Sequence, residues 1–335
     1  MTDLNSIHQP VLLDECVRLV SPALDHANAV VVDCTLGLAG HAIAVLRSAP
    51  QAHLIGIDRD EEALRLAGER MRREGLSDRF TPVHAAFDEL EDVLGGEGIK
   101  EIDAAFMDLG LSSLQIDETE RGFSYAHDAP LDMRMDTGQT LTAADILSSY
   151  SMQRLTTIFR EYGEERFSRP IARAIVDSRE SAPLRTSKDL NELVDATVPK
   201  AHRPAGNPAK RVFQALRIEV NGELEKLSQT LPQIAAHLKL HGRIVVESYH
   251  SLEDRTVKRF MTAGTRVNVP PGLPIIPKEA QPYFKDLTHG AVMADEAQIA
   301  DNPRSASVRL RAVELIRRIP EQTLRQYEED RKGRG

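Results

Sequence analysis

The stretch VVVDCTLGLAGH, residues 30–41, decides the fold of this 335-residue chain. It begins as a run of β-branched valines, continues through Gly37 and Gly40, and is followed by the helix-forming residues 42–46. A buried strand, a glycine loop and a helix start are typical of the ligand site that opens a doubly wound α/β sheet. Glycines let the backbone approach a ligand closely, and a helix that begins near His41 offers unpaired N–H groups. We therefore predict an α/β fold with a cofactor site at this loop. The alternative is an ordinary tight turn between a strand and a helix.

The loop departs from the dinucleotide-binding fingerprint, which spaces its glycines as G-x-G-x-x-G. Residues 37–40 read GLAG instead. Because the fingerprint is what brings a pyrophosphate onto the helix N-terminus, phosphate binding is not the evident purpose of this loop. A nicotinamide-dependent oxidoreductase is therefore an alternative that the loop disfavours.

The second expected strand, residues 54–58, ends in Asp58, 18 residues after Gly40. In sheets of this type an acidic residue at that position accepts hydrogen bonds from both hydroxyls of a ribose. Asp58 is thus the candidate ribose ligand. The alternative is that its carboxylate caps the helix expected over residues 61–74.

Two further expected strands end in candidate ligands. Phe87 and Asp88 follow the strand at residues 80–84, and Asp108 ends the strand at residues 102–108. Ligands of open α/β sheets bind beyond the carboxyl ends of the strands, so an adenine would stack on Phe87 or hydrogen-bond to Asp88. Burial of Phe87 in the core is the alternative.

The composition is that of a globular protein in the cytoplasm. Hydrophobic residues make up 41% of the chain and charged residues 28%. No apolar run approaches the ~18 residues of a membrane helix, and the first residues lack the pattern of a signal peptide. Two cysteines, Cys16 and Cys34, are too few for a disulfide framework or a four-ligand zinc site, so no metal site is expected.

The chain length and strand spacing indicate an inserted domain. After the strand that ends at Asp108, the next convincing strand covers residues 242–248. A crossover helix needs only about a dozen residues, so most of the intervening chain must fold separately. Its apolar residues recur at helical spacing, which predicts an all-α insertion. We place the core at residues 1–115 and 212–320, the insertion at 116–211 and a charged, frayed tail at 321–335.

A basic stretch lies near the end of the expected insertion. The residues from 196 to 218 hold five cations and no carboxylate, although the whole chain has a net charge of −9. Such a local concentration of positive charge suits the phosphates of a nucleic acid. A solvated loop is the alternative. The candidates for RNA contact are Lys200, Arg203, Lys210 and Arg211.

Taken together, these features resemble class I S-adenosylmethionine methyltransferases, and longer strings resemble one family in particular. The strings are HQPVLL (8–13), DLGLSSLQ (108–115), RGFSY (121–125), PLDMRMD (130–136), YGEER (162–166) and SLEDRTVKRF (251–260). They are similar to the MraW/RsmH family, the bacterial 16S ribosomal RNA cytosine-N4 methyltransferases, over residues 8 to about 313. The resemblance implies a substrate in the 16S rRNA of the small ribosomal subunit. It also implies that the cofactor S-adenosylmethionine is held by Ala39, Gly40, His41, Asp58, Phe87, Asp108 and Gln115.

Two positions depart from the family pattern, because Cys34 and Ala39 stand where glycines are usual. The residue that aligns the target amine is also open. Asp108 is the candidate, with a neighbouring backbone carbonyl as the alternative, and LGLSS at residues 109–113 replaces the Pro-Pro-aromatic motif of related amino methyltransferases. A non-catalytic RNA-binding assembly factor remains an alternative function, and the sequence leaves open whether the chain forms a homodimer.

Overall fold

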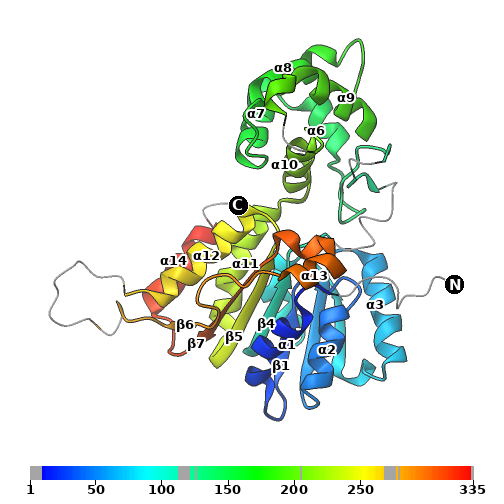
Figure 1. The fold of residues 1–335 in the computed structure, drawn as a ribbon. Helices are drawn as coiled ribbons and strands as arrows, with labels where there is room; N and C mark the ends of the chain where they lie inside the picture. The colour runs from blue at the N-terminus through cyan, green and yellow to red at the C-terminus, as the bar shows by residue number, and fades with distance from the viewer. Residues whose placement is uncertain are drawn as a thin grey trace. The chain divides into compact units, whose positions relative to one another are not determined.

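The computed structural model describes residues 10–111, 121–124, 127–203, 206–267, 277 and 280–332. The chain divides into two compact units (Figure 1). The core unit comprises Met1–Gly110 and Leu224–Gly335, and the inserted unit comprises Leu111–Glu223. We describe each unit by itself.

The core unit is built on one seven-stranded sheet in the order β3-β2-β1-β4-β5-β7-β6. The strands are β1 (Val30–Asp33), β2 (His53–Asp58), β3 (Phe80–His84), β4 (Ile102–Asp108), β5 (Leu238–Ser248), β6 (Phe284–Asp286) and β7 (Arg309–Leu315). The first five strands run parallel, whereas β7 is antiparallel to both β5 and β6. The predicted α/β sheet is confirmed, and the order of its strands is that of a doubly wound fold with a switch point between β1 and β4.

Helices cover both faces of this sheet, and each face has its own hydrophobic core. Apolar side chains of α1 (Leu13–Val20), α2 (Gly40–Ser48) and α3 (Glu61–Arg73) form one core with Val31 and Leu54. The other core joins α4 (Leu90–Gly96), α11 (Glu223–His237) and α12 (Ser251–Thr265) to Val32 and Ile55. Neighbouring strand residues thus point into opposite cores, which explains why β1 reads as an unbroken apolar run.

The C-terminal segment corrects one expectation, because it is a helix and not a frayed tail. Helix α14 (Glu321–Lys332) packs Leu324 against the second core. The hydroxyl oxygens of Tyr327 and Tyr283 lie 2.9 Å apart, and the rings of Tyr327 and Phe260 lie 5.9 Å apart. The apolar residues of α14 are few, so a charged composition hid a helix that tertiary packing stabilises.

The inserted unit is helical in its regular elements. These are α6 (Ala143–Ser149), α7 (Met152–Glu161), α8 (Ser168–Ser178), α9 (Ser187–Thr197), the 3-10 turn η5 (Lys200–His202) and α10 (Lys210–Asn221). Thr142, Ser151 and Thr186 cap the first turns of α6, α7 and α9 with their side chains. These caps satisfy N–H groups that the helices leave unpaired and define where each helix begins.

Helix α10 lies in the inserted unit, whereas the sequence placed residues 212 onward in the core. Its apolar face packs with α6 and α7 through Val212, Phe213 and Leu216. The helix ends at Asn221, and the following residue, Gly222, has the left-handed conformation (φ 63°) that glycine adopts without steric cost. The boundary between the units therefore follows the end of α10.

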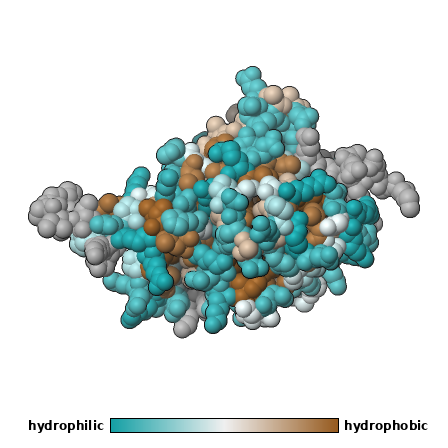
Figure 2. Space-filling view, turned by 90° about the horizontal axis from the view of Figure 1, so that it is seen from below, coloured by the Kyte–Doolittle hydropathy of each residue, from teal (hydrophilic) through white to brown (hydrophobic). Residues whose placement is uncertain are grey.

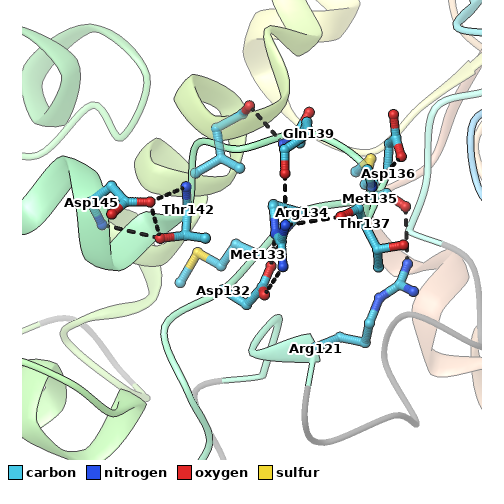
Figure 3. A network of polar contacts seen from close by, with 12 residues as sticks. Arg121, Asp132, Met133, Arg134, Met135, Asp136, Thr137, Gln139, Thr142 and Asp145 are labelled. Carbon is cyan, nitrogen blue, oxygen red and sulfur yellow. Dashed lines mark hydrogen bonds and ion pairs between the residues drawn. The ribbon is translucent and has the colours of Figure 1, made fainter.

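A loop of the inserted unit is fixed by one arginine (Figure 3). The guanidinium of Arg134 donates to both oxygens of Asp132, at 2.8 Å each, and to the carbonyls of Thr137 and Gln139. Arg134 is thus committed to holding its own loop, which disfavours a role for this cation in binding phosphate.

The described residues contain no helix that is long and apolar enough to cross a membrane. The face of the molecule in Figure 2 is mostly hydrophilic, and its apolar residues form small separate areas.

Candidate active site in the core unit

The candidate site lies where four parallel strands end. Asp33, Asp58 and Asp108 are the last residues of β1, β2 and β4, and Glu247 is the penultimate residue of β5. Because the strands run in one direction, the four carboxyl groups share one edge of the sheet. The sequence predicted this convergence for Asp58 and Asp108, and it missed Asp33 and Glu247.

The loop after β1 is tied to the end of β2 by two backbone N–H groups. Leu36 N–H donates to the carbonyl of Ile57 at 3.0 Å, and Gly37 N–H donates to Asp58 Oδ2 at 2.7 Å. The other oxygen, Oδ1, accepts from Asp60 N–H at 2.9 Å. The cap of α3 is Asp60, which accepts from Glu62 and Ala63, so Asp58 does not cap that helix.

The two glycines of the loop serve different purposes. Gly37 has φ +50°, and a Cβ built there would meet only Thr35 O, at 4.0 Å, so the space above it is open. A Cβ on Gly40 would lie 2.5 Å from Pro10 Cγ. Gly40 therefore makes room for Pro10, whereas Gly37 leaves open space, and a contact between Gly40 and the cofactor stays a prediction.

Ala39 carries the backbone conformation that the family fills with glycine. It is left-handed (φ 61°, ψ 26°) and immediately precedes α2. Its methyl group is fully buried in the first hydrophobic core. The methyl group therefore packs in this core, and a contact between the Ala39 backbone and the cofactor stays a prediction. The left-handed conformation costs alanine about 1–2 kcal/mol, which the surrounding core must offset.

His41 is a buried link between this loop and the strands. Its Nε2 lies 3.0 Å from the carbonyl of Val11, and its ring centroid lies 4.5 Å from that of Phe106. Its Nδ1 lies 3.9 Å from Asp108 Oδ2. Burial lowers the pKa of His41, and the attraction of Asp108 opposes this effect only in part. The ring is therefore neutral at pH 7.

Asp108 is held in place through its backbone and its side chain. Its N–H donates to Thr35 Oγ1 at 2.6 Å, and its Oδ1 accepts from Gly110 N–H at 3.1 Å. Burial and the nearby Asp108 carboxylate raise the pKa of the Tyr249 phenol well above its usual range. The side chain remains 27% exposed, so a ligand can reach it.

Cys16, His41 and Glu247 form a buried polar cluster that the sequence did not reveal. Cys16 Sγ donates to Glu247 Oε1 at 3.4 Å, and Glu247 Oε2 lies 3.6 Å from His41 Nε2. Burial raises the pKa of Glu247 well above its usual range. The sequence feature that could have revealed the cluster is the position of Glu247, a carboxylate inside the apolar run of β5.

The cluster contains three types of metal ligand, each with a donor atom within 4.8 Å of the others. However, His41 Nε2 is placed to donate its proton to Val11 O. A ring nitrogen that carries a proton has no lone pair for a metal, so the geometry favours a hydrogen-bonded cluster.

Phe87 and Asp88, which follow β3, differ in whether their side chains are available to a ligand. Phe87 begins the turn η3 (Phe87–Glu89) and is half-buried against the second core, so both of its expected roles fit. Both oxygens of Asp88 are bound by Lys226 Nζ, at 2.8 and 2.9 Å. Asp88 is therefore engaged in an ion pair, which disfavours the hydrogen bond to adenine. Gln115 lies outside the described residues.

Of the four cations expected to contact RNA, Arg203 is held in an ion pair, and Arg211 donates one hydrogen bond to the carbonyl of Glu164. Lys200, Lys210 and Arg211 are exposed on the inserted unit. Arg203 instead donates to the carbonyls of Val198 and Asp195 and pairs with the Asp195 carboxylate at 2.7 Å. It binds the C-terminal end of α9, where a cation is favoured by the helix dipole. Arg203 therefore serves the fold.

Two arginines that the sequence analysis did not single out lie near the others. Gly163 packs closely on Arg211, because a Cβ placed on Gly163 would lie 2.6 Å from the carbonyl oxygen of Arg211. The guanidinium of Arg211 also donates to the carbonyl of Glu164. These contacts place the loop before α8 beside the start of α10. The exposed Arg166 lies in this loop, and Arg169 lies in the first turn of α8. On the same side, the ring of His202 in η5 lies 5.6 Å from that of Phe167.

Comparison with known proteins gives a consistent result over nearly the whole chain. Residues 5–316 match the model of the MraW methylase family. "Ribosomal RNA small subunit methyltransferase H" of Bifidobacterium longum subsp. infantis is 68% identical over 333 residues, which cover 99% of this chain and 93% of that protein. The protein of the same name from Beutenbergia cavernae is 53% identical and covers 94% of both chains.

Solved structures are more distant. A putative methyltransferase from Streptococcus mutans in complex with SAH has a TM-score of 0.41 and 10% identity, and covers 92% of this chain and 99% of that one. The family assignment therefore rests on the sequence matches, which extend across both units. The chain belongs to the MraW methylase family.

Proposed function

We propose that this protein transfers a methyl group from S-adenosylmethionine to the exocyclic N4 amine of a cytidine in the 16S rRNA of the small ribosomal subunit. The observation that carries the proposal is the full-length similarity to proteins named ribosomal RNA small subunit methyltransferase H. The resemblance of the sequence strings supplies the identity of the base and of the atom. A cytoplasmic location and a homodimer stay predictions.

Several features of the candidate site support the binding of S-adenosylmethionine there. Gly37 leaves open space at the loop. In the described part of the chain, the Asp58 carboxylate accepts from the backbone N–H groups of Gly37 and Asp60, so its oxygens retain lone pairs for the ribose hydroxyls. Phe87 is half-buried in the turn that follows β3, and an aromatic ring at this position suits stacking on an adenine. Ala39 and His41 hold the loop, and Gln115 is a further expected ligand.

When bound, S-adenosylmethionine supplies an electrophilic methyl group on a sulfonium. The chain must then align the amine of cytosine, whose lone pair is delocalised into the ring. We assign this role to Asp108, because its carboxylate is partly exposed and accepts a hydrogen bond from Gly110 N–H. A carboxylate that accepts an amine N–H orients the lone pair toward the methyl group, and orientation supplies much of the rate.

The inserted unit supports RNA binding through a basic surface, which we define as Lys200, Lys210, Arg211, Arg166 and Arg169. All five side chains are exposed. Phosphate contacts from such residues give affinity and position without reading sequence. The target base must also leave its stack to enter a pocket, which a single-stranded or flexible region of rRNA allows at low cost.

Methyl transfer from labelled cofactor to undermethylated small subunits and to free rRNA, followed by nucleoside analysis, tests the proposal. We expect N4-methylated cytidine, with Asp108→Ala strongly reduced in rate. Label in another nucleoside would overturn the assignment of the base. Binding of NAD in place of S-adenosylmethionine would support an oxidoreductase, and rRNA binding with no transfer would support a non-catalytic assembly factor.

A further inference from the structure

The candidate site holds an excess of carboxyl groups that the protein itself does not neutralise. Asp33 is 2% exposed and Glu247 is 0% exposed, and Asp58 and Asp108 lie at the same sheet edge. In the described part of the chain, no lysine or arginine forms an ion pair with any of these four groups; His41, the basic side chain nearest to two of them, is neutral. Burying carboxylates without a cation costs several kcal/mol each, so this arrangement requires either protons or a cationic ligand.

Glu247 adds an independent observation about this site. Its Oε2 is buried and has no hydrogen-bond partner among the described residues. The groups that face Glu247 are Cys16 and Glu15 from α1, His41 from α2, Asp33 from β1, and Asp108 from β4. Tyr249 follows on its own strand. None of these groups brings a positive charge at pH 7.

Asp33 has a similar environment with fewer partners. Its Oδ1 accepts from Thr35 N–H at 3.1 Å, and the titratable groups that face it are Asp108, Asp58 and Glu247. Burial, opposed by the hydrogen bond from Thr35, raises the pKa of Asp33 to about 8. At pH 7 the Asp33 carboxyl group is therefore mostly protonated before any ligand binds.

S-adenosylmethionine carries a positive sulfonium, whereas its product S-adenosylhomocysteine is a neutral thioether at the same atom. We propose that Asp33 and Glu247 hold protons in the free protein and release one of them to solvent when the sulfonium binds, so that the site prefers the charged methyl donor to its neutral product. This inference rests on the proposed function and on the placement of the cofactor at this sheet edge. No covalent bond other than the O–H bond is broken.

The sign of the effect follows from linkage. Binding of a cation favours the ionised carboxyl groups, so below about pH 8 the free protein must lose a proton to bind S-adenosylmethionine tightly. The dissociation constant should therefore fall as pH rises, by up to about tenfold per pH unit, and level off above that pH. The dissociation constant of S-adenosylhomocysteine should not follow this trend, because no sulfonium charge enters the site.

Calorimetric titration of the full chain tests the inference. The probes are S-adenosylmethionine and S-adenosylhomocysteine, each titrated at about pH 7 in two buffers of different ionisation enthalpy. The difference in binding enthalpy between the two buffers gives the number of protons released. Because the amino acid part of each ligand also titrates, the decisive comparison is between wild type and the double variant Asp33→Asn, Glu247→Gln. These amides have nearly the shape of the neutral acids, so the variant should fold, which its melting temperature checks.

We expect wild type to release about 0.5–1 proton more with S-adenosylmethionine than the double variant does, and no such difference with S-adenosylhomocysteine. The matched control is Asp78→Asn, which removes an exposed carboxylate on η2 (Ser77–Arg79) and should behave as wild type. Equal proton release by wild type and the double variant would overturn the inference while leaving the proposed function intact. A wild-type protein that binds no S-adenosylmethionine would overturn the proposed function itself.

Discussion

Gly37 donates its backbone N–H to Asp58 Oδ2 at 2.7 Å, across 21 residues of sequence. This hydrogen bond joins the loop after β1 to the end of β2, so the residue expected to bind a ribose also shapes the cradle beside it. A charge-assisted hydrogen bond of this kind is stronger than one between neutral groups. The two parts of the candidate cofactor site are therefore not independent.

Replacing Asp58 with alanine should accordingly weaken cofactor binding by more than the ribose contacts alone. Each charge-assisted hydrogen bond contributes roughly 1.5–3 kcal/mol, and the loop also loses the partner of Gly37 N–H. Asp58→Asn keeps the shape and one acceptor oxygen, so it should lose less. Isothermal titration with S-adenosylmethionine measures both. Wild-type affinity in a folded Asp58→Ala protein would exclude Asp58 from the site.

The sequence could predict Asp58 because the end of a strand is a local property, readable from an apolar run and the residue that follows it. It could not predict that Gly40 faces Pro10 or that Glu247 faces Cys16, because such pairs are set by tertiary packing. The same limit applies to Arg203 and α14. Composition marked Arg203 as a free cation and α14 as a frayed tail, yet the partners of both are visible only once the chain is folded.

Gly40→Ala should destabilise the fold, because the new methyl group would lie 2.5 Å from Pro10 Cγ. Overpacking of this kind costs about 1–3 kcal/mol. The matched control is Gly68→Ala in α3, where a Cβ meets nothing within 4 Å. That control should stabilise the helix by about 0.5–1 kcal/mol. Denaturant unfolding of the two variants should therefore give opposite signs, and equal behaviour would contradict the contact with Pro10.

Tyr327 should contribute measurably to stability although it lies in the charged C-terminal segment. Tyr327→Ala removes the contact with Phe260 and the hydrogen bond to Tyr283, at a cost of about 1–3 kcal/mol. Tyr327→Phe removes only the hydrogen bond, which is worth about 0.5–1.5 kcal/mol. Chemical denaturation ranks the two variants. No loss in either would mean that α14 does not pack on the core in solution.

The basic surface of the inserted unit should bind phosphates through a subset of its cations. Changing Lys200, Lys210 and Arg211 together to glutamine should lower rRNA affinity and leave cofactor affinity intact, since all three lie outside the core unit. The slope of log affinity against log salt should become shallower by up to ~0.7–0.9 for each phosphate that the variant no longer neutralises.

Arg203→Gln provides the contrast to this triple variant. Because Arg203 is bound to Asp195 and Val198, its loss should lower the melting temperature and leave the salt slope unchanged. A triple variant with the wild-type salt slope would show that these three side chains only face water. A shallower salt slope in Arg203→Gln would show that Arg203 contacts phosphates of the RNA.

The protonation of Asp33 should also be visible in the stability of the protein without ligand. Its pKa is raised to about 8 in the folded state, chiefly by burial, from about 4 in an unfolded chain. Between these two values the folded state binds more protons than the unfolded state, so this group makes the free energy of unfolding decrease as pH rises, by at most about 1.4 kcal/mol per pH unit. Below about pH 4 this destabilisation by Asp33 is absent, and above about pH 8 it is complete.

The variant Asp33→Asn cannot ionise, so it should be more stable than wild type at pH 8 and about as stable as wild type at pH 4. The difference at pH 8 is on the order of 5 kcal/mol as an upper bound. Urea unfolding of both proteins across this range measures the difference. A constant difference at every pH would show that Asp33 has the same pKa in both states and is ionised at neutral pH in the folded protein.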